Sequence, residues 1–119
     1  MIEFISVGLE DRVLGLRIRG RIERTDLEAV TLALEDKLTR HERVRVYAEV
    51  DDFGGISPSA LLADLRLGVR HYRDVDQEAV VTDASWMGAL AKAGNLLPGI
   101  EVRAFETKDK ASAQAWING

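Results

Sequence analysis

The sequence predicts an α/β domain in which helices pack on a mixed β-sheet. Two observations support this prediction: two strand-like runs are joined by a short connection near the start, and four strands, counted from the second run, are each followed by a helical pattern. The short connection favours an antiparallel hairpin, whereas repeated strand–helix units require parallel neighbours and right-handed crossovers. The predicted order is therefore ββαβαβαβα, in one domain over residues 1–119 with about four helices.

Composition excludes several classes of protein. The chain has no cysteine, so it cannot form disulfides, thiolate metal sites or a cysteine nucleophile. Its 20 acidic and 16 basic residues give a net charge of −4, which argues against general nucleic-acid binding. It shows no secretory leader and no apolar run of about 20 residues, so we expect a soluble, cytoplasmic protein. Peripheral contact with a membrane stays open.

The predicted hairpin consists of Ile2–Val7 and Arg12–Arg19. Apolar and polar residues alternate in the second run, which is typical of a strand with one core face and one more exposed face. Gly20 is expected to end this strand.

An amphipathic helix is predicted over residues 25–40. Thr25 and Glu28 have the spacing of a capping box, in which the threonine accepts first-turn N–H groups and the glutamate reaches back. Leucine and valine then recur at helical spacing and form one apolar stripe.

The centre of the chain predicts a strand, an acidic loop and a second helix. Apolar residues alternate with polar ones over Val44–Val50, so this strand has one apolar face and one mixed face that needs a cover or water. If the mixed face is covered, Glu49 needs a partner such as an arginine. Ser57 and Pro58 supply an N-cap and a first-turn residue for a helix over residues 58–73. The residues expected to form the loop before it include Asp51, Asp52, Gly54 and Gly55.

The last two strands and the last helix follow from shorter patterns. Glu78–Thr82 is apolar on both faces, as expected of a buried parallel strand, and Glu101–Glu106 alternates. Lys108–Ile117 is predicted to be an alanine-rich helix whose Ala111 and Ala115 face inward.

Between these strands, Ser85–Leu97 is predicted to be a helix that is apolar almost all round. A surface helix normally shows a polar face, so we expect something to cover this one. The candidates are the domain's own core, a second copy in a homodimer, a lipid-like ligand and a membrane surface. The residues expected to contact a ligand or partner are Trp86, Met87, Leu90, Leu97 and Tyr72.

Two clusters of charged residues, one acidic and one basic, each have a functional and a structural interpretation. Asp51, Asp52 and Asp83 follow predicted strands, where Mg²⁺ could bind, but capping and turn formation account for all three, so no metal or cofactor is expected. The arginines between Arg17 and Arg24 could meet a phosphate headgroup or an acidic partner, but pairing with nearby acids is favoured. No nucleophile-elbow or phosphate-loop pattern appears, so we do not expect an enzyme.

Several stretches resemble SpoIIAA-like proteins. They are the N-terminal hairpin, the aspartate before F-G-G, the helix LLADLRLGVRHYRD, the step A-V-V-T-D-A-S-W, and the strand E-V-R-A-F-E followed by A-S-A-Q-A-W-I. The resemblance implies a fold similar to STAS domains of the anti-sigma-factor-antagonist type, related in architecture to CRAL-TRIO lipid-transfer domains, and no established catalytic activity.

The resemblance also suggests a regulatory loop formed by Asp51, Asp52 and Ser57. Anti-sigma antagonists carry a phosphorylatable serine at this place, often as aspartate-x-serine, and Ser57 is its nearest counterpart. Here the segment from Asp52 to Ile56 separates the serine from the acids, and helix capping explains Ser57 fully. The leading hypothesis is a STAS-like module that binds a hydrophobic or lipid-like ligand; the alternative is a regulatory protein-interaction module.

Overall fold

Five strands form one mixed sheet in the computed structural model, which describes residues 1–71, 73–84, 92 and 99–119. The spatial order of the strands is the same as their order in the chain. The first two strands pair antiparallel, and every other neighbouring pair is parallel. The predicted N-terminal hairpin and mixed α/β sheet are thus confirmed. The strands are β1 (Ile2–Ile5), β2 (Val13–Ile22), β3 (Val44–Ile56), β4 (Val75–Val81) and β5 (Glu101–Phe105).

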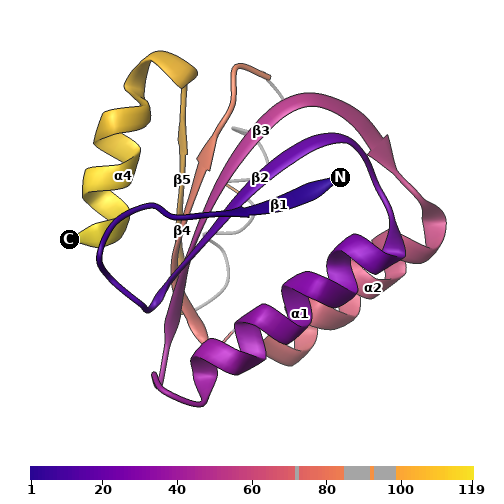
Figure 1. Cartoon of the computed structure of the whole chain (residues 1–119), viewed down its shortest axis with the longest axis horizontal. Helices are drawn as coiled ribbons and strands as arrows, with labels where there is room; N and C mark the ends of the chain where they lie inside the picture. Colours follow the sequence, from indigo (N-terminus) through magenta and orange to yellow (C-terminus); the bar gives the residue numbers. More distant parts are fainter. Residues whose placement is uncertain (72, 85–91, 93–98) are drawn as a thin grey trace.

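Helices cover both faces of the sheet. Figure 1 shows α1 and α2 side by side on one face and α4 on the opposite face. The predicted helix over residues 85–97 lies outside the described residues. The described helices are α1 (Arg24–Leu38), α2 (Pro58–His71), the short 3₁₀ turn η1 (Thr107–Asp109) and α4 (Lys110–Asn118).

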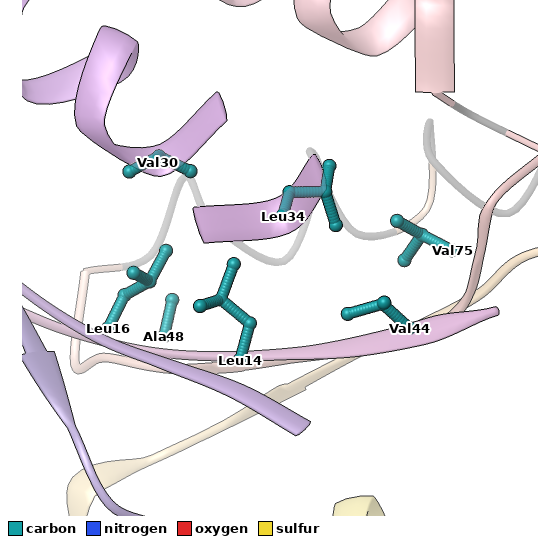
Figure 2. Packing of buried hydrophobic residues seen from close by; sticks show 7 residues of the cluster. All are labelled: Leu14, Leu16, Val30, Leu34, Val44, Ala48 and Val75. Carbon is teal, nitrogen blue, oxygen red and sulfur yellow. The ribbon is translucent and has the colours of Figure 1, made fainter. Parts of the chain in front are cut away.

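The main core lies between the sheet and α1. Val30 and Leu34 of α1 point toward apolar side chains of β2 and β3, as Figure 2 shows. Alternation along each strand places these side chains on one face. The buried members of this core are Leu14, Leu16, Val30, Leu34, Val44, Ala48 and Val75.

A second core lies under α4 on the opposite face. Its centre is Tyr47 of β3, which is fully buried against Ala113 and Ile117 of α4. The prediction that Ala111 and Ala115 face inward is wrong, because both are exposed. The helix begins at Lys110, after the 3₁₀ turn, and the i, i+4 pair formed by Ala113 and Ile117 is the one that meets the sheet.

The start of α1 also differs from the prediction. The helix begins at Arg24, and the backbone N–H of Glu23 donates to Oδ2 of Asp26 at 2.8 Å. Glu23 and Asp26 therefore form the capping box, two residues before the expected pair. Glu28, which was expected to cap, forms an ion pair with Arg24 instead.

Candidate functional site

β3 continues six residues past the point at which the sequence predicts its end. Beyond Glu49, the last β3 residue paired with β4, its second half pairs with β2 alone. The acidic, glycine-containing segment is therefore a strand, and Gly20 does not end β2. We call Arg19–Ile22 and Asp51–Ile56 together the β2–β3 extension (Figure 1).

Unusual backbone conformations let these residues stay in a strand. Arg19 pairs with Asp51 and Gly20 with Phe53, so Asp52 is an extra, bulged residue. Asp52 has a φ of 46°, and Gly20 has a φ of 62°. Gly54 lies so close to the backbone of Gly20 that a Cβ on it would be 3.0 Å from the Gly20 carbonyl carbon. Glycine is needed at that contact because the two strands approach closely there.

Ser57 caps α2, as predicted. Its hydroxyl accepts a hydrogen bond from the backbone N–H of Ala60 at 3.2 Å, and Ser57 is buried. The Ser57 N–H donates to the Ile22 carbonyl at 3.0 Å, which fixes the end of the extension to β2. The junction between strand and helix is thus held at both ends by hydrogen bonds.

The three aspartates singled out in the sequence line one cavity. The cavity has a volume of about 210 Å³ and lies where β4 ends, beside residues 50–53 of β3. Asp83 accepts a hydrogen bond from the Thr107 N–H, and Asp51 pairs with Arg19 at 3.9 Å. Among the described residues, no three histidine or acidic side chains are placed to hold a metal ion. The Thr107 N–H and Arg19 thus give Asp83 and Asp51 partners within the chain. The cavity is lined by Val50, Asp51, Asp52, Phe53, Thr82, Asp83, Ala84 and Thr107.

Glu49 is buried under α4 and has three partners. Its carboxylate accepts hydrogen bonds from Tyr47 at 2.8 Å and from Arg17 at 3.3 Å, and Lys110 lies 3.4 Å away. Burial alone would raise the pKa of Glu49, but the Tyr47 hydroxyl and the two cations together hold that pKa below its ordinary value. The expectation that a covered Glu49 needs an arginine is confirmed; the sequence did not identify Lys110 as a further partner.

The phenol of Tyr47 remains protonated in this network. Burial raises the pKa of Tyr47 to about 12, and the negative charge of Glu49 acts in the same direction. Gln114 of α4 donates a hydrogen bond to the Tyr47 oxygen at 3.3 Å. The network therefore ties β2, β3 and α4 together.

The arginines between Arg17 and Arg24 do not form an unneutralised basic patch. Each lies within 4 Å of a carboxylate: Arg17 of Glu49, Arg19 of Asp51, Arg21 of Glu23, and Arg24 of Glu28. This supports the structural interpretation over a site for phosphate headgroups.

Two exposed apolar side chains lie in the region that the sequence marked as regulatory. Phe53, on the extension, is 37% exposed, and Leu62, on the second turn of α2, is 49% exposed. Sequence reasoning singled out neither of them as a contact residue; Phe53 lies between Asp52 and Gly54, in the segment that was expected to be a loop. The residues predicted to contact a ligand, Trp86, Met87, Leu90, Leu97 and Tyr72, lie outside the described part of the chain.

None of the helices in the described ranges is long and apolar enough to cross a membrane.

Comparisons with known proteins agree with the fold. The family model described as SpoIIAA-like matches residues 13–118. A solved structure of an uncharacterised protein of the DUF3478 family, with a SpoIIAA-like fold, from Shewanella loihica PV-4 is 22% identical in sequence. It superimposes with a TM-score of 0.79 over 98% of this chain and 93% of that chain. At this identity the likeness concerns the fold alone. The comparison with curated proteins gives no match.

Proposed function

Because the chain belongs to the SpoIIAA-like family, we propose that it is a non-enzymatic module that binds a protein partner. The proposed contact surface is the β2–β3 extension together with the first turns of α2. The observation that carries the proposal is the exposure of Phe53 and Leu62, two large apolar side chains at a strand-to-helix junction. Aromatic side chains such as phenylalanine are enriched in the buried core of protein interfaces, and an exposed leucine beside one adds apolar contact area.

The backbone around these anchors supports the proposal. The Ser57 cap, its hydrogen bond to Ile22 and the close packing of Gly54 on Gly20 fix the junction before any partner binds. A preformed surface loses less conformational entropy on association than a flexible loop does.

The charges beside the anchors favour a protein over an anionic membrane. Asp52 is exposed next to Phe53, and Arg66 is exposed one turn after Leu62. A surface with both signs of charge suits a partner with complementary charges of both signs, whereas an anionic bilayer attracts basic groups only.

Phosphorylation of Ser57 is not part of the proposal. The Ser57 hydroxyl is buried and accepts the capping hydrogen bond, so a kinase would have to open the first turn of α2. Ser59, two residues later, is exposed and serves as a matched control for variants at Ser57.

The test is quantitative affinity enrichment from the native host, followed by measurement of binding to each purified candidate. We expect the double variant Phe53→Ser, Leu62→Ser to lose at least tenfold in affinity. The control Leu32→Ser, which removes an apolar side chain that is 71% exposed on α1, should bind like the native chain. A partner that binds both variants equally well would overturn the assignment of this surface.

Binding of a hydrophobic or lipid-like ligand is the second candidate function. It rests on the resemblance to CRAL-TRIO domains and on the apolar sequence of residues 85–97. Native mass spectrometry after gentle purification tests it, because a retained ligand adds its mass to the 13.2 kDa chain. A ligand-free spectrum, together with no binding of a fluorescent fatty-acid probe, would contradict this function.

A further inference from the structure

β1 is an edge strand with backbone groups that point away from the sheet. The Arg19 N–H donates to the Met1 carbonyl at 2.9 Å, which makes Met1 and Arg19 a hydrogen-bonded pair of the antiparallel ladder. Such pairs alternate along a ladder, so Glu3 and Ile5 direct their N–H and C=O groups toward β2, and Ile2 and Phe4 direct theirs outward. The Ile2 N–H accordingly reaches Asp26, which lies outside the sheet. Phe4 keeps an outward donor and an outward acceptor.

β1 is short and carries one charge, Glu3, but it lacks three other features that prevent edge strands from pairing. β1 contains no lysine and no proline, and its register with β2 has no bulge. Three of the large apolar side chains that are exposed in the described residues belong to this strand or flank it: Met1 at 52%, Phe4 at 49% and Leu9 at 105%. The opposite edge, β5, instead exposes the ion pair of Glu101 and Arg103.

We propose that a second copy of this chain pairs antiparallel with β1 about a two-fold axis at Phe4, so that two five-stranded sheets join into one. Two-fold pairing makes the same surface serve both copies, which closes the assembly at a dimer. This inference concerns a surface separate from the one proposed for the protein partner.

The charges on β1 select the register. Centring the axis on Glu3 would place two glutamates directly opposite each other, which is unfavourable. Centring it on Phe4 places the two phenylalanines opposite each other and moves each Glu3 opposite Ile5 of the other copy. In both registers the outward backbone groups of one β1 face those of the other β1. The side chains therefore decide between the registers. The register centred on Phe4 is favoured because it forms an aromatic pair across the two strands.

The surroundings of β1 fit this arrangement. Antiparallel pairing brings the end of β1 beside Arg19 toward the turn of the other copy, which carries Glu10. These two side chains have opposite charges and are about half exposed, although each also forms an ion pair within its own chain, Arg19 with Asp51 and Glu10 with Arg12. Phe4 also lines a cavity of about 460 Å³ between the hairpin and α1, with Ala33 on the opposite wall.

Single-cysteine cross-linking tests the register, because the native chain contains no cysteine. Opposed residues of a hydrogen-bonded antiparallel pair have Cα atoms about 5.5 Å apart, within the range that a disulfide spans. Under mild oxidation we expect Phe4→Cys to form a covalent dimer at least tenfold faster than Glu3→Cys or the exposed control Leu32→Cys. Faster cross-linking of Glu3→Cys would overturn the register, and equal rates for Phe4→Cys and Leu32→Cys would overturn the interface.

Light scattering of the native chain tests the dimer without any substitution. We expect a mass twice the 13.2 kDa of one chain, and we expect Phe4→Lys to restore the single-chain mass with an unchanged circular dichroism spectrum. A native chain that stays at 13.2 kDa up to about millimolar concentration would overturn the proposal. The Phe53→Ser, Leu62→Ser variant should remain dimeric, so failure of the dimer and failure of the proposed function give different results.

Discussion

The Tyr47 hydroxyl donates a hydrogen bond of 2.8 Å to Glu49 in the layer between β3 and α4. Both residues are at least 95% buried, and they project from the same face of one strand. Since the raised pKa of Tyr47 keeps it a donor and the lowered pKa of Glu49 keeps it an acceptor, the bond persists across the physiological pH range. It fixes the carboxylate to which Lys110 of α4 binds.

Glu49→Gln should lower the free energy of unfolding by about 1–3 kcal/mol at pH 7. The amide keeps the shape of the side chain but removes the charge that Arg17 and Lys110 share, and hydrogen bonds to charged groups contribute in this range. Urea denaturation measures the change. As a control, Glu101→Gln breaks an exposed pair with Arg103 and should change stability by less than about 1 kcal/mol.

The difference between native chain and Glu49→Gln should shrink as the pH falls. The folded-state pKa of Glu49 is depressed, so its stabilising contribution is fully present above the unfolded-state pKa of about 4.3 and is lost as the pH falls through the folded-state value. Denaturant melts between about pH 7 and pH 3 measure this. A difference that stays constant over that range would show that the charge of Glu49 does not contribute.

Ser57→Ala should destabilise the protein by about 0.5–2 kcal/mol, because it removes the cap on the Ala60 N–H. Ser59→Ala is the matched control: the same change at an exposed serine two residues later removes no cap and should be close to neutral. Thermal or urea melts of both variants measure the contrast. If the two variants were equally stable, the capping hydrogen bond would carry no net stability.

The sequence predicted correctly those parts of the fold that depend only on residues close together in the chain. The cap at Ser57 needs only the residues of the next turn, and the alternation over Val44–Val50 needs only the strand itself. The end of β3 was predicted wrongly, because aspartate and glycine normally break strands. Here pairing with β2 and the glycine conformations at Gly20 and Gly55 keep the segment extended. Tertiary pairing thus overrides local preference.

The partners of Glu49 show a second limit of prediction from the sequence: contacts between distant elements. Alternation placed Glu49 on the mixed face of its strand. A buried carboxylate needs a partner of opposite charge, so a cation was expected there. Arg17 and Lys110, however, come from β2 and α4, which only the chain topology brings to that face. The sequence therefore specified the kind of partner correctly but could not identify both residues.

Two glycine substitutions should act in opposite directions. A Cβ at Gly15 would overlap the carbonyl oxygen of Ile5 and lie 2.5 Å from Cγ2 of Val7, so Gly15→Ala should destabilise by about 1–3 kcal/mol. Gly68 lies inside α2 with nothing within 4 Å of the added atom, so Gly68→Ala should stabilise by roughly 0.5–1 kcal/mol through helix propensity. Urea melts measure both changes in the free energy of unfolding. A Gly15→Ala variant as stable as the native chain would mean that β1 can move away from β2 without loss of stability.

Glu78→Gln should stabilise the protein at pH 7. Glu78 pairs in register with Val46 of β3, on the face of the sheet that α1 covers. Burial raises the pKa of Glu78, and the negative charge of Asp64 on α2 raises it further. A carboxylate whose pKa is raised on folding binds its proton more tightly in the folded state. The ionised form therefore opposes folding, and one pKa unit corresponds to about 1.4 kcal/mol.

The pH dependence of this variant should have the opposite sign to that of Glu49→Gln. The contribution of protonated Glu78 is fully present below the unfolded-state pKa of about 4.3 and is lost as the pH rises through the raised folded-state value. The advantage of Glu78→Gln over the native chain should thus be large at pH 7 and vanish toward pH 4. A Glu78→Gln variant less stable than the native chain at pH 7 would show that the native carboxylate is held by a compensating cation.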